Sequence, residues 1–318
     1  MADRSAFDHD TTTDQVLEGL DLTGRTAIVT GSSGGLGAEA ARALASKGAS
    51  VTITARDVPK GEKVAAEIRS STGNEAVEVR RLELGSIDSV REFAASWRAD
   101  HGPLHILLNN AGVMASPFER TEGGFELQFG TNHLGHFLLT GLLAPALIEG
   151  APSRVVCVSS GGHRLSPVVF EDIQYEERPY DKWEAYGQAK TANVLHAVEL
   201  DRRLRDKGVR AFSIHPGGIM TELGRHLDEN DIKMLADRGM GSTMRFKQIP
   251  AGAATEVYAA TAPELDGRGG LYLEDCHVAE IASDPTRTDG VEAYALDPEN
   301  ARRLWEESER LLGVHFEL

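Results

Sequence analysis

Short runs of β-branched and apolar residues alternate along most of this chain with longer stretches that have helical spacing. We expect strands at 26–30, 50–55, 76–82, 104–109, 154–159, 209–215 and 270–273. Among the intervening stretches, 35–47 and 60–71 have apolar or alanine positions at helical spacing, and the first is followed by a glycine. This alternation predicts βαβ units, and therefore an α/β fold built on a parallel sheet of about seven strands.

The two ends of the chain lack this pattern. Residues 1–21 form a polar lead-in with one short candidate helix at 14–19, and 298–312 have the composition of a surface helix docked on the domain. We assign no chemistry to either segment.

The charge balance excludes several classes of partner. The chain has 33 Lys and Arg against 49 Asp and Glu, a formal net charge of −16, whereas nucleic acids and anionic membranes are bound mainly through excess Lys and Arg. The longest apolar run, 137–148, is too short to span a membrane, which takes about 20 residues.

Only two cysteines occur, Cys157 and Cys276, without CxxC spacing. We therefore expect a soluble protein of a reducing compartment, the cytoplasm.

A glycine-rich loop joins the first predicted strand to the first predicted helix. Small residues there let the backbone approach a pyrophosphate, and the following helix N-terminus offers unpaired N–H groups. Because the loop has this position in an alternating chain, we interpret it as a dinucleotide site. Its candidate contact residues are Gly31, Ser33, Gly34, Gly35, Leu36 and Gly37.

The end of the second strand bears on the choice between NAD and NADP. An acidic side chain there would bind the adenosine ribose, but this chain has Ala55 followed by Arg56. Arg56 could face a 2′-phosphate, so NADP(H) is favoured and NAD(H) stays open. The alternative is that Arg56 is a solvated surface residue or pairs with Asp57.

Two further strand ends supply cofactor candidates. Glu83, with Leu84 beside it, follows the third strand and could reach the adenine amino group, or could be an exposed loop residue. Asn110, Ala111 and Gly112 close the fourth strand, where small residues suit a turn against a cofactor, although alone they would be an ordinary turn.

The candidate reacting groups are hydroxyl, amide and amine side chains. Tyr186 and Lys190 are four residues apart in a helical stretch, so they share a face, and a nearby cation stabilises a phenolate. Ser160 ends the fifth strand, at the edge where such sheets place ligands. Asn132 lies in the preceding helical stretch, where a buried amide needs a specific partner. The alternatives are a partly buried Tyr, a solvated Lys and a helix-bending Asn.

The motifs TGSSGGLG, NNAG, YGQAK and HPGGIMT, with Asn132 and Ser160 between them, occur in the order of the short-chain dehydrogenase/reductase family. The resemblance covers about residues 22–275. The segments NNAGVMASP, TNHLGHFLLT and DKWEAYGQAKTANVL are similar to the retinol dehydrogenase and WW-domain oxidoreductase branch, although no WW domain is present.

This resemblance implies one doubly wound Rossmann domain over 22–318, with strand order 3-2-1-4-5-6-7, that exchanges a hydride between NADP(H) and an alcohol or carbonyl. Tyr186 would be the acid/base, and Lys190 would lower the Tyr186 pKa and bind the nicotinamide ribose. Ser160 would hold the substrate oxygen, and Asn132 would anchor a water that connects Lys190 to solvent. The loop that packs against the nicotinamide would include Pro216, Gly217, Ile219 and Thr221.

The sequence departs from the family pattern in two places. The interval from Ser160 to Tyr186 is 26 positions, longer than in typical small members, and we expect the extra segment to shape a wall of the site. This segment contains His163, Phe170, Ile173, Tyr175, Tyr180 and Trp183. The glycine loop also lacks the basic residue that many NADP-using members have, which leaves Arg56 as the main indication of NADP.

The substrate is less defined than the reaction. Residues 222–249 would form an apolar lid through Met234, Met240, Met244 and Phe246, or pack as an ordinary helix pair. We expect a hydrophobic alcohol or carbonyl and no catalytic metal, because the histidines lack ligand spacing. A catalytically silent regulator or scaffold of the same fold is the alternative function.

Self-association is a further expectation. Family members often pair through the helices that hold Asn132 and Tyr186, and the apolar run after Asn132 is compatible with a homodimer or homotetramer. The same run would serve a buried core helix equally well.

Overall fold

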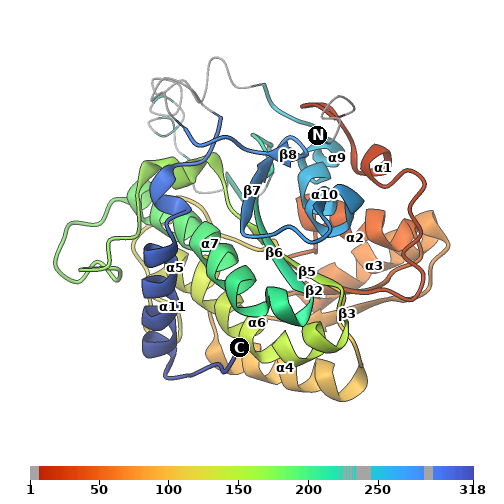
Figure 1. The fold of residues 1–318 in the computed structure, drawn as a ribbon, viewed down its shortest axis with the longest axis horizontal. Coiled ribbons are helices and arrows are strands. Elements are labelled where there is room, and N and C mark those ends of the chain that lie inside the picture. The colour runs from red at the N-terminus through yellow and green to blue at the C-terminus, as the bar shows by residue number, and fades with distance from the viewer. Residues whose placement is uncertain are drawn as a thin grey trace.

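The computed structural model describes residues 7–221, 223, 224, 227, 229, 231, 233, 245–282 and 289–318. Within them, eight strands form one sheet of order β3-β2-β1-β4-β5-β6-β7-β8, which crosses the centre of the molecule (Figure 1). The strands are β1 Thr26–Val29, β2 Ser50–Ala55, β3 Val77–Arg81, β4 Ile106–Asn109, β5 Ser153–Val158, β6 Val209–His215, β7 Leu271–Glu274 and β8 His277–Val278. The first seven are parallel, and β8 runs antiparallel to β7.

The expected α/β class and the order of the first seven strands are confirmed, whereas the strand count was one too low. The missed strand, β8, has two residues and follows β7 after the tight turn at Asp275 and Cys276. Both turn residues have positive φ, 44° and 57°. A two-residue strand carries no periodicity that sequence patterns could detect.

Helices cover both faces of the sheet (Figure 1). One face packs against α2, α3 and α10, and the other against α4, α6 and α7. The α-helices are α1 Thr13–Val16, α2 Gly35–Ser46, α3 Val58–Thr72, α4 Ile87–Asp100, α5 Leu127–Phe129, α6 Gly135–Glu149, α7 Lys182–Leu204, α9 Ile249–Gly252, α10 Ala254–Thr261 and α11 Pro298–Leu312. The short turns are η1 Gly130–Leu134, η2 Gly161–Leu165, η3 Arg205–Lys207, η5 Pro263–Leu265 and η6 Ala293–Ala295.

The expected C-terminal helix is α11, which covers part of the apolar run in α6. The Trp305 ring lies 4.7 Å from the Phe137 ring, and the Phe316 ring lies 5.8 Å from it. A Cβ built on Gly141 would clash with the Phe316 ring. The apolar run was interpreted either as a surface for self-association or as a buried core helix. The structure shows a buried core helix, part of which the C-terminal segment of the same chain covers.

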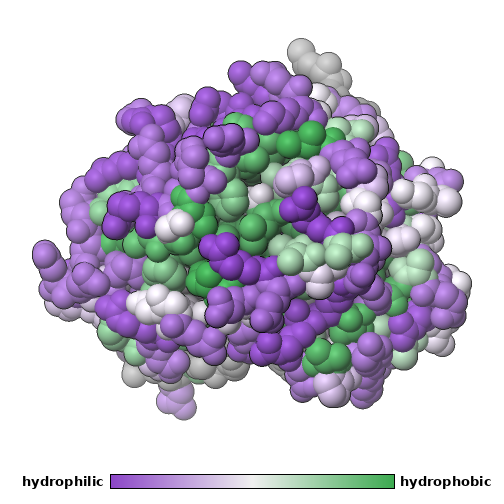
Figure 2. Space-filling view, turned by 90° about the horizontal axis from the view of Figure 1, so that it is seen from below, coloured by the Kyte–Doolittle hydropathy of each residue, from purple (hydrophilic) through white to green (hydrophobic). Residues whose placement is uncertain are grey.

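The surface is rich in charged side chains, as the composition requires. Figure 2 shows one face, on which apolar side chains gather near the middle and hydrophilic side chains surround them. No helix of the described part of the chain is both long enough and apolar enough to cross a membrane.

Candidate active site

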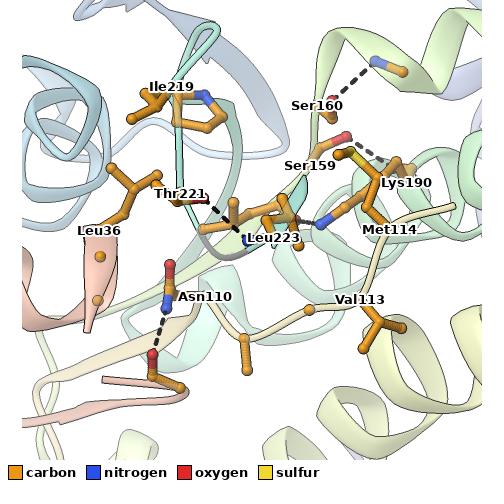
Figure 3. Close-up of a pocket in the computed structure, with 18 of the residues that line it drawn as sticks. Leu36, Asn110, Val113, Met114, Ser159, Ser160, Lys190, Ile219, Thr221 and Leu223 are labelled. Atoms are coloured by element: carbon orange, nitrogen blue, oxygen red, sulfur yellow. Dashed lines mark hydrogen bonds between the residues drawn. The ribbon is translucent and has the colours of Figure 1, made fainter. Parts of the chain in front are cut away.

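An open groove of about 2530 Å³ runs along the carboxyl ends of the parallel strands. Leu36 and Asn110 line one side of it, while Ser160 and Lys190 line another (Figure 3). This is the edge at which doubly wound sheets place their ligands. The glycine loop and the candidate reacting groups, far apart in sequence, therefore share one groove.

The glycine loop runs from β1 into α2 and has the form needed to hold a pyrophosphate. A Cβ on Gly31 would be 2.7 Å from the Ala111 Cβ, and one on Gly37 would be 2.5 Å from the Asn110 Nδ2. Gly34, the residue before α2, gives that helix no side-chain cap. The first N–H groups of α2 are thus available to an anion, as at other helix N-termini that bind phosphate.

Three cations line the groove near the end of β2. The Arg56 side chain is 67 % exposed, and its Nε lies 3.6 Å from the Glu83 Oε2. Asp57 instead caps α3 by accepting a hydrogen bond from the Lys60 N–H, and the ion pair that the structure shows for Arg56 is the one with Glu83. Lys60 and Arg81 line the groove as well, and sequence reasoning missed both. Their positions in the sequence could have indicated them, because Lys60 lies in the first turn of the helix after β2 and Arg81 is the last residue of β3.

The turn after β4 connects the glycine loop to the reacting groups. The Asn110 Nδ2 donates to the Thr30 carbonyl at 2.7 Å, which holds the turn against β1. A Cβ on Gly112 would be 3.2 Å from the Asn132 Oδ1 and 3.6 Å from the Lys190 Nζ. Glycine at this position lets the chain pass close to both side chains.

Asn132 lies in η1, a π-helical turn between α5 and α6. Its side chain accepts a hydrogen bond from the Val113 N–H at 2.8 Å and donates to the Val113 carbonyl at 2.9 Å. Its own carbonyl lies 2.9 Å from the His136 Nδ1. The buried amide therefore has protein partners, and it fixes the segment that follows Gly112. Such π-turns are frequent at functional sites.

Ser159 and Ser160 follow β5, but they face different partners. The Ser159 hydroxyl donates to the Lys190 carbonyl at 2.8 Å and ties β5 to α7. The Ser160 Oγ accepts a hydrogen bond from the Gly162 N–H at 3.0 Å and lies near the Tyr186 ring, since a Cβ on Gly162 would be 3.3 Å from this oxygen and 2.6 Å from the Tyr186 Cε1. Ser160 is thus the serine that can meet a substrate beside Tyr186.

Tyr186 and Lys190 share one face of α7, and each side chain is only 3 % exposed. Burial raises the pKa of Tyr186 to about 12, and the nearby Ser160 side chain opposes this rise. Burial lowers the pKa of Lys190 to about 8. The Lys190 Nζ donates to the Val158 carbonyl at 3.0 Å and lies 5.7 Å from the Tyr186 ring centre. The lowering of the Tyr186 pKa by Lys190, which the resemblance implied, stays a prediction, since burial and the Ser160 side chain are the causes that act on this pKa here.

The loop after β6 spans the groove from the reacting groups to the glycine loop. Near its start, Gly217 has φ +96° and lies against Lys247, so that a Cβ there would be 2.9 Å from the Lys247 Cδ. Ile219 forms a bridge with Lys247, and Thr221 lies next to Gly35. Pro216, Gly217, Ile219 and Thr221, which were expected in this loop, all line the groove (Figure 3 labels Ile219 and Thr221).

Apolar side chains surround Tyr186 on the side away from the glycine loop. Trp183 packs edge-on against Tyr186 at 6.3 Å between ring centres. Met114, Leu165 and Leu227 complete this wall, and sequence reasoning did not single them out. Of the six residues of the long insert that were expected to shape a wall, Trp183 alone lines the groove. Of the other five, Phe170 and Ile173 pack in a cluster with residues of α11, Tyr175 packs against Tyr180, and His163 bonds to the Glu292 N–H.

The expected lid is described only in part. Met234, Met240 and Met244 lie outside the described residues, whereas Phe246 is half exposed and lines the groove. The Asp231 carboxylate accepts hydrogen bonds from the Trp183 Nε1 at 2.9 Å and the Lys182 Nζ at 2.6 Å. These two bonds join the lid segment to the beginning of α7. In the described ranges, no group of three or more His, Cys, Asp or Glu side chains could hold a metal ion.

The fold and the groove define a dinucleotide-binding oxidoreductase with a tyrosine, a lysine and a serine at its reacting end. The family model for short chain dehydrogenase matches residues 25–232, and the chain belongs to this family. It is an NAD(P)-dependent oxidoreductase that acts on CH–OH or C=O groups, of the retinol dehydrogenase-like branch.

Relatives and solved structures agree with this assignment. The chain is 43% identical to retinol dehydrogenase 11 of Homo sapiens over 93% of its own length and 88% of the relative. It is 44% identical to a probable oxidoreductase of Streptomyces lividans, covering 90% and 97%. A crystal structure of an uncharacterized protein from Mycobacterium paratuberculosis is similar with a TM-score of 0.74 and 34% identity, covering 95% and 98%.

Proposed function

We propose that this protein is an NADP(H)-dependent reductase or dehydrogenase of a hydrophobic alcohol or carbonyl compound, with Tyr186 as the acid/base. One observation carries the proposal: the neighbouring side chains of Tyr186 and Ser160 line the groove at an apolar wall of Met114, Leu165 and Trp183. A carbonyl oxygen between the two hydroxyls would place the rest of the substrate against this wall.

The reaction uses the protonated phenol. With a pKa raised to about 12 by burial, Tyr186 keeps its proton at neutral pH and can give it to the alkoxide oxygen as a carbonyl is reduced. Ser160 holds the same oxygen by a hydrogen bond. The nicotinamide, when bound, exchanges the hydride with the substrate carbon. In the oxidation direction, the deprotonated form of Tyr186 would accept the proton of the alcohol.

Lys190 and Asn132 support these groups. With a pKa of about 8, the Lys190 ammonium is mostly charged at neutral pH and can bind the ribose hydroxyls beside the nicotinamide. Asn132 holds the segment after Gly112 in place. We further propose that a water at Asn132 connects Lys190 to solvent, so that the proton lost by Tyr186 is replaced.

The preference for NADP(H) rests on charge. Arg56, Lys60 and Arg81 line the groove near the end of β2, where the adenosine ribose binds in Rossmann folds. These cations suit a 2′-phosphate. One structural relative at 26% identity is described as an RhlG/NADP active-site complex of Pseudomonas aeruginosa. NAD(H) would lack the phosphate and would gain nothing from these side chains.

The preference for a hydrophobic substrate rests on the apolar wall. Two relatives are named retinol dehydrogenase 11 and 12, after a largely apolar alcohol. We place the site in one domain that includes residues 22–318. The two cysteines of the chain are free and buried, which fits a reducing compartment such as the cytoplasm.

A homodimer or homotetramer stays a proposal, and its interface would need a surface other than the part of α6 that α11 covers. A monomer mass by light scattering at micromolar concentration would refute it.

The experiment that tests this function measures NADPH and NADH consumption against a panel of hydrophobic aldehydes, ketones and quinones. The Tyr186→Phe variant is run beside the natural protein. Turnover that depends on Tyr186 and prefers NADPH is expected. Intact NADPH binding without turnover of any panel member would contradict the proposed substrate class.

A further inference from the structure

The loop that follows Ser160 contains two glycines in succession, Gly161 and Gly162. Gly162 has to be glycine, because a Cβ there would be 2.6 Å from the Tyr186 Cε1. Glycines leave the backbone more conformational freedom than any other residue. The Ser160 hydroxyl depends on this backbone, since it accepts a hydrogen bond from the Gly162 N–H at 3.0 Å. Some other contact must therefore restrain the loop.

The restraint acts on the Ser160 carbonyl, on which three donors converge. The His163 N–H lies 3.1 Å from this oxygen, and the His163 Nδ1 lies 2.7 Å from it. The Tyr272 hydroxyl lies 3.4 Å from it. With its carbonyl held in this way, the peptide between Ser160 and Gly161 cannot rotate without breaking these hydrogen bonds.

The hydrogen bond at the second nitrogen of the His163 ring, Nε2, shows which ring nitrogen carries the proton. The Glu292 N–H donates to the His163 Nε2 at 3.1 Å. A backbone amide can only donate, so Nε2 has to be the unprotonated acceptor. The proton of the neutral ring is then on Nδ1, where it points at the Ser160 carbonyl. The His163 side chain is fully buried, so water does not compete for either nitrogen.

The Glu292 segment is itself bound firmly to this loop. The Arg164 Nε lies 3.1 Å from the Glu292 Oε1, and the Arg164 Nη1 donates to the Asp289 carbonyl at 3.1 Å. The Tyr294 hydroxyl donates to the His163 carbonyl at 2.8 Å. Residues 289–294 are therefore hydrogen-bonded to the loop that follows Ser160, although they come about 130 positions later in the chain.

We propose that His163 is a positioning residue. In its Nδ1-protonated form it binds both residues 289–294 and the Ser160 carbonyl, and so fixes the orientation of the Ser160 hydroxyl. The proposal rests on the proposed function, in which Ser160 holds the substrate oxygen. His163 does not line the groove, so we do not expect it to touch a substrate. Its effect is to keep the Ser160 backbone, and hence the hydroxyl beside Tyr186, in the orientation that the transition state requires.

The test compares His163→Phe with His163→Asn. Phenylalanine keeps the ring packing against Tyr272 but removes both hydrogen bonds. Asparagine loses the ring but has an amide donor near the position of Nδ1, within reach of the Ser160 carbonyl. We expect His163→Phe to lower kcat at least tenfold, with KM changed less than threefold and the NADPH Kd unchanged within twofold. His163→Asn should recover kcat to within about threefold of the natural protein.

Tyr294→Phe is the matched control. It removes one hydrogen bond between the same two segments, but not one that reaches Ser160, so kcat should stay within about twofold. The proposal is overturned if His163→Asn is as impaired as His163→Phe, or if Tyr294→Phe is as impaired as either. Those results would mean that His163 matters only for packing.

A second readout needs no turnover and separates this proposal from the proposed function. Long-range ¹H–¹⁵N correlation spectra of ¹⁵N-histidine-labelled protein report which ring nitrogen carries the proton, and the His163→Asn spectrum identifies the signal. We expect a single Nδ1-protonated ring. An Nε2-protonated ring or an averaged pattern would overturn the proposal, even if no substrate in the panel were turned over.

Discussion

The Lys190 Nζ donates a hydrogen bond to the carbonyl of Val158 at 3.0 Å and lies 5.7 Å from the centre of the Tyr186 ring. The ammonium is therefore bound to the end of β5 rather than to the phenol. Burial then determines the pKa of Tyr186, about 12, and the phenol is protonated at neutral pH. This is the form that a proton donor to a nascent alkoxide needs.

Tyr186→Phe should abolish turnover and leave cofactor binding nearly unchanged. The substitution removes only the proton donor, and the ring still packs against Trp183. Steady-state rates with saturating NADPH and a fluorescence titration of NADPH would check the two parts. A variant with normal turnover would exclude Tyr186 as the acid/base, whereas lost NADPH binding would point to a structural defect.

Arg56→Ala should weaken NADPH binding by about 1.5–3 kcal/mol, the range for hydrogen bonds to charged groups, and leave NADH binding nearly unchanged. The reason is that only NADPH has the 2′-phosphate. The matched control is Lys63→Ala, which removes one positive charge from the exposed side of α3, outside the groove. Equal losses for NADPH and NADH would mean that Arg56 is structural.

Asp231→Ala should raise KM for hydrophobic substrates about tenfold, with a smaller effect on kcat. The Asp231 carboxylate accepts hydrogen bonds from the Trp183 Nε1 and the Lys182 Nζ, and so fixes the indole that forms part of the apolar wall. Asp231→Asn keeps an acceptor for the indole and should have an intermediate effect. Initial-rate kinetics with one ketone and one aldehyde check this, and an unchanged KM in Asp231→Ala would contradict it.

Glu256→Gln should stabilise the protein at alkaline pH and have little effect near pH 4.5. The Glu256 carboxylate is fully buried in α10, neither oxygen has a hydrogen-bond partner among the described residues, and burial raises its pKa from 4.5 to about 8. Between these two values the folded state binds more protons than the unfolded state, so stability falls as pH rises. The resulting loss in the free energy of unfolding is complete above pH 8 and is at most about 5 kcal/mol.

Urea unfolding at pH 5 and pH 8.5 measures the Glu256 effect. Glu67→Gln, at an exposed position on α3, is the control and should change the free energy of unfolding little at either pH. If Glu256→Gln shifts stability equally at both pH values, the carboxylate does not titrate as described.

Local pattern predicted much of this protein. The parallel strands, the glycine loop and the helix that holds Tyr186 and Lys190 each depend on neighbouring residues: β-branched runs, small residues and four-residue spacing. The order of the first seven strands came from the family resemblance. The two-residue strand β8 has too little pattern of its own to be recognised.

Tertiary structure determined the partners and the protonation states. The positions of Lys60 and Arg81 beside strand ends were a signal that local pattern offered, but no local pattern could indicate that Asp231 would bind Trp183, because this contact depends on how distant segments pack. The pKa of Tyr186 likewise depends on burial, a property of the assembled fold. The sequence by itself therefore determined which chemical groups the chain offers and in which elements. Only the packing of those elements decided which groups meet, which are desolvated, and that His163 holds the loop of Ser160.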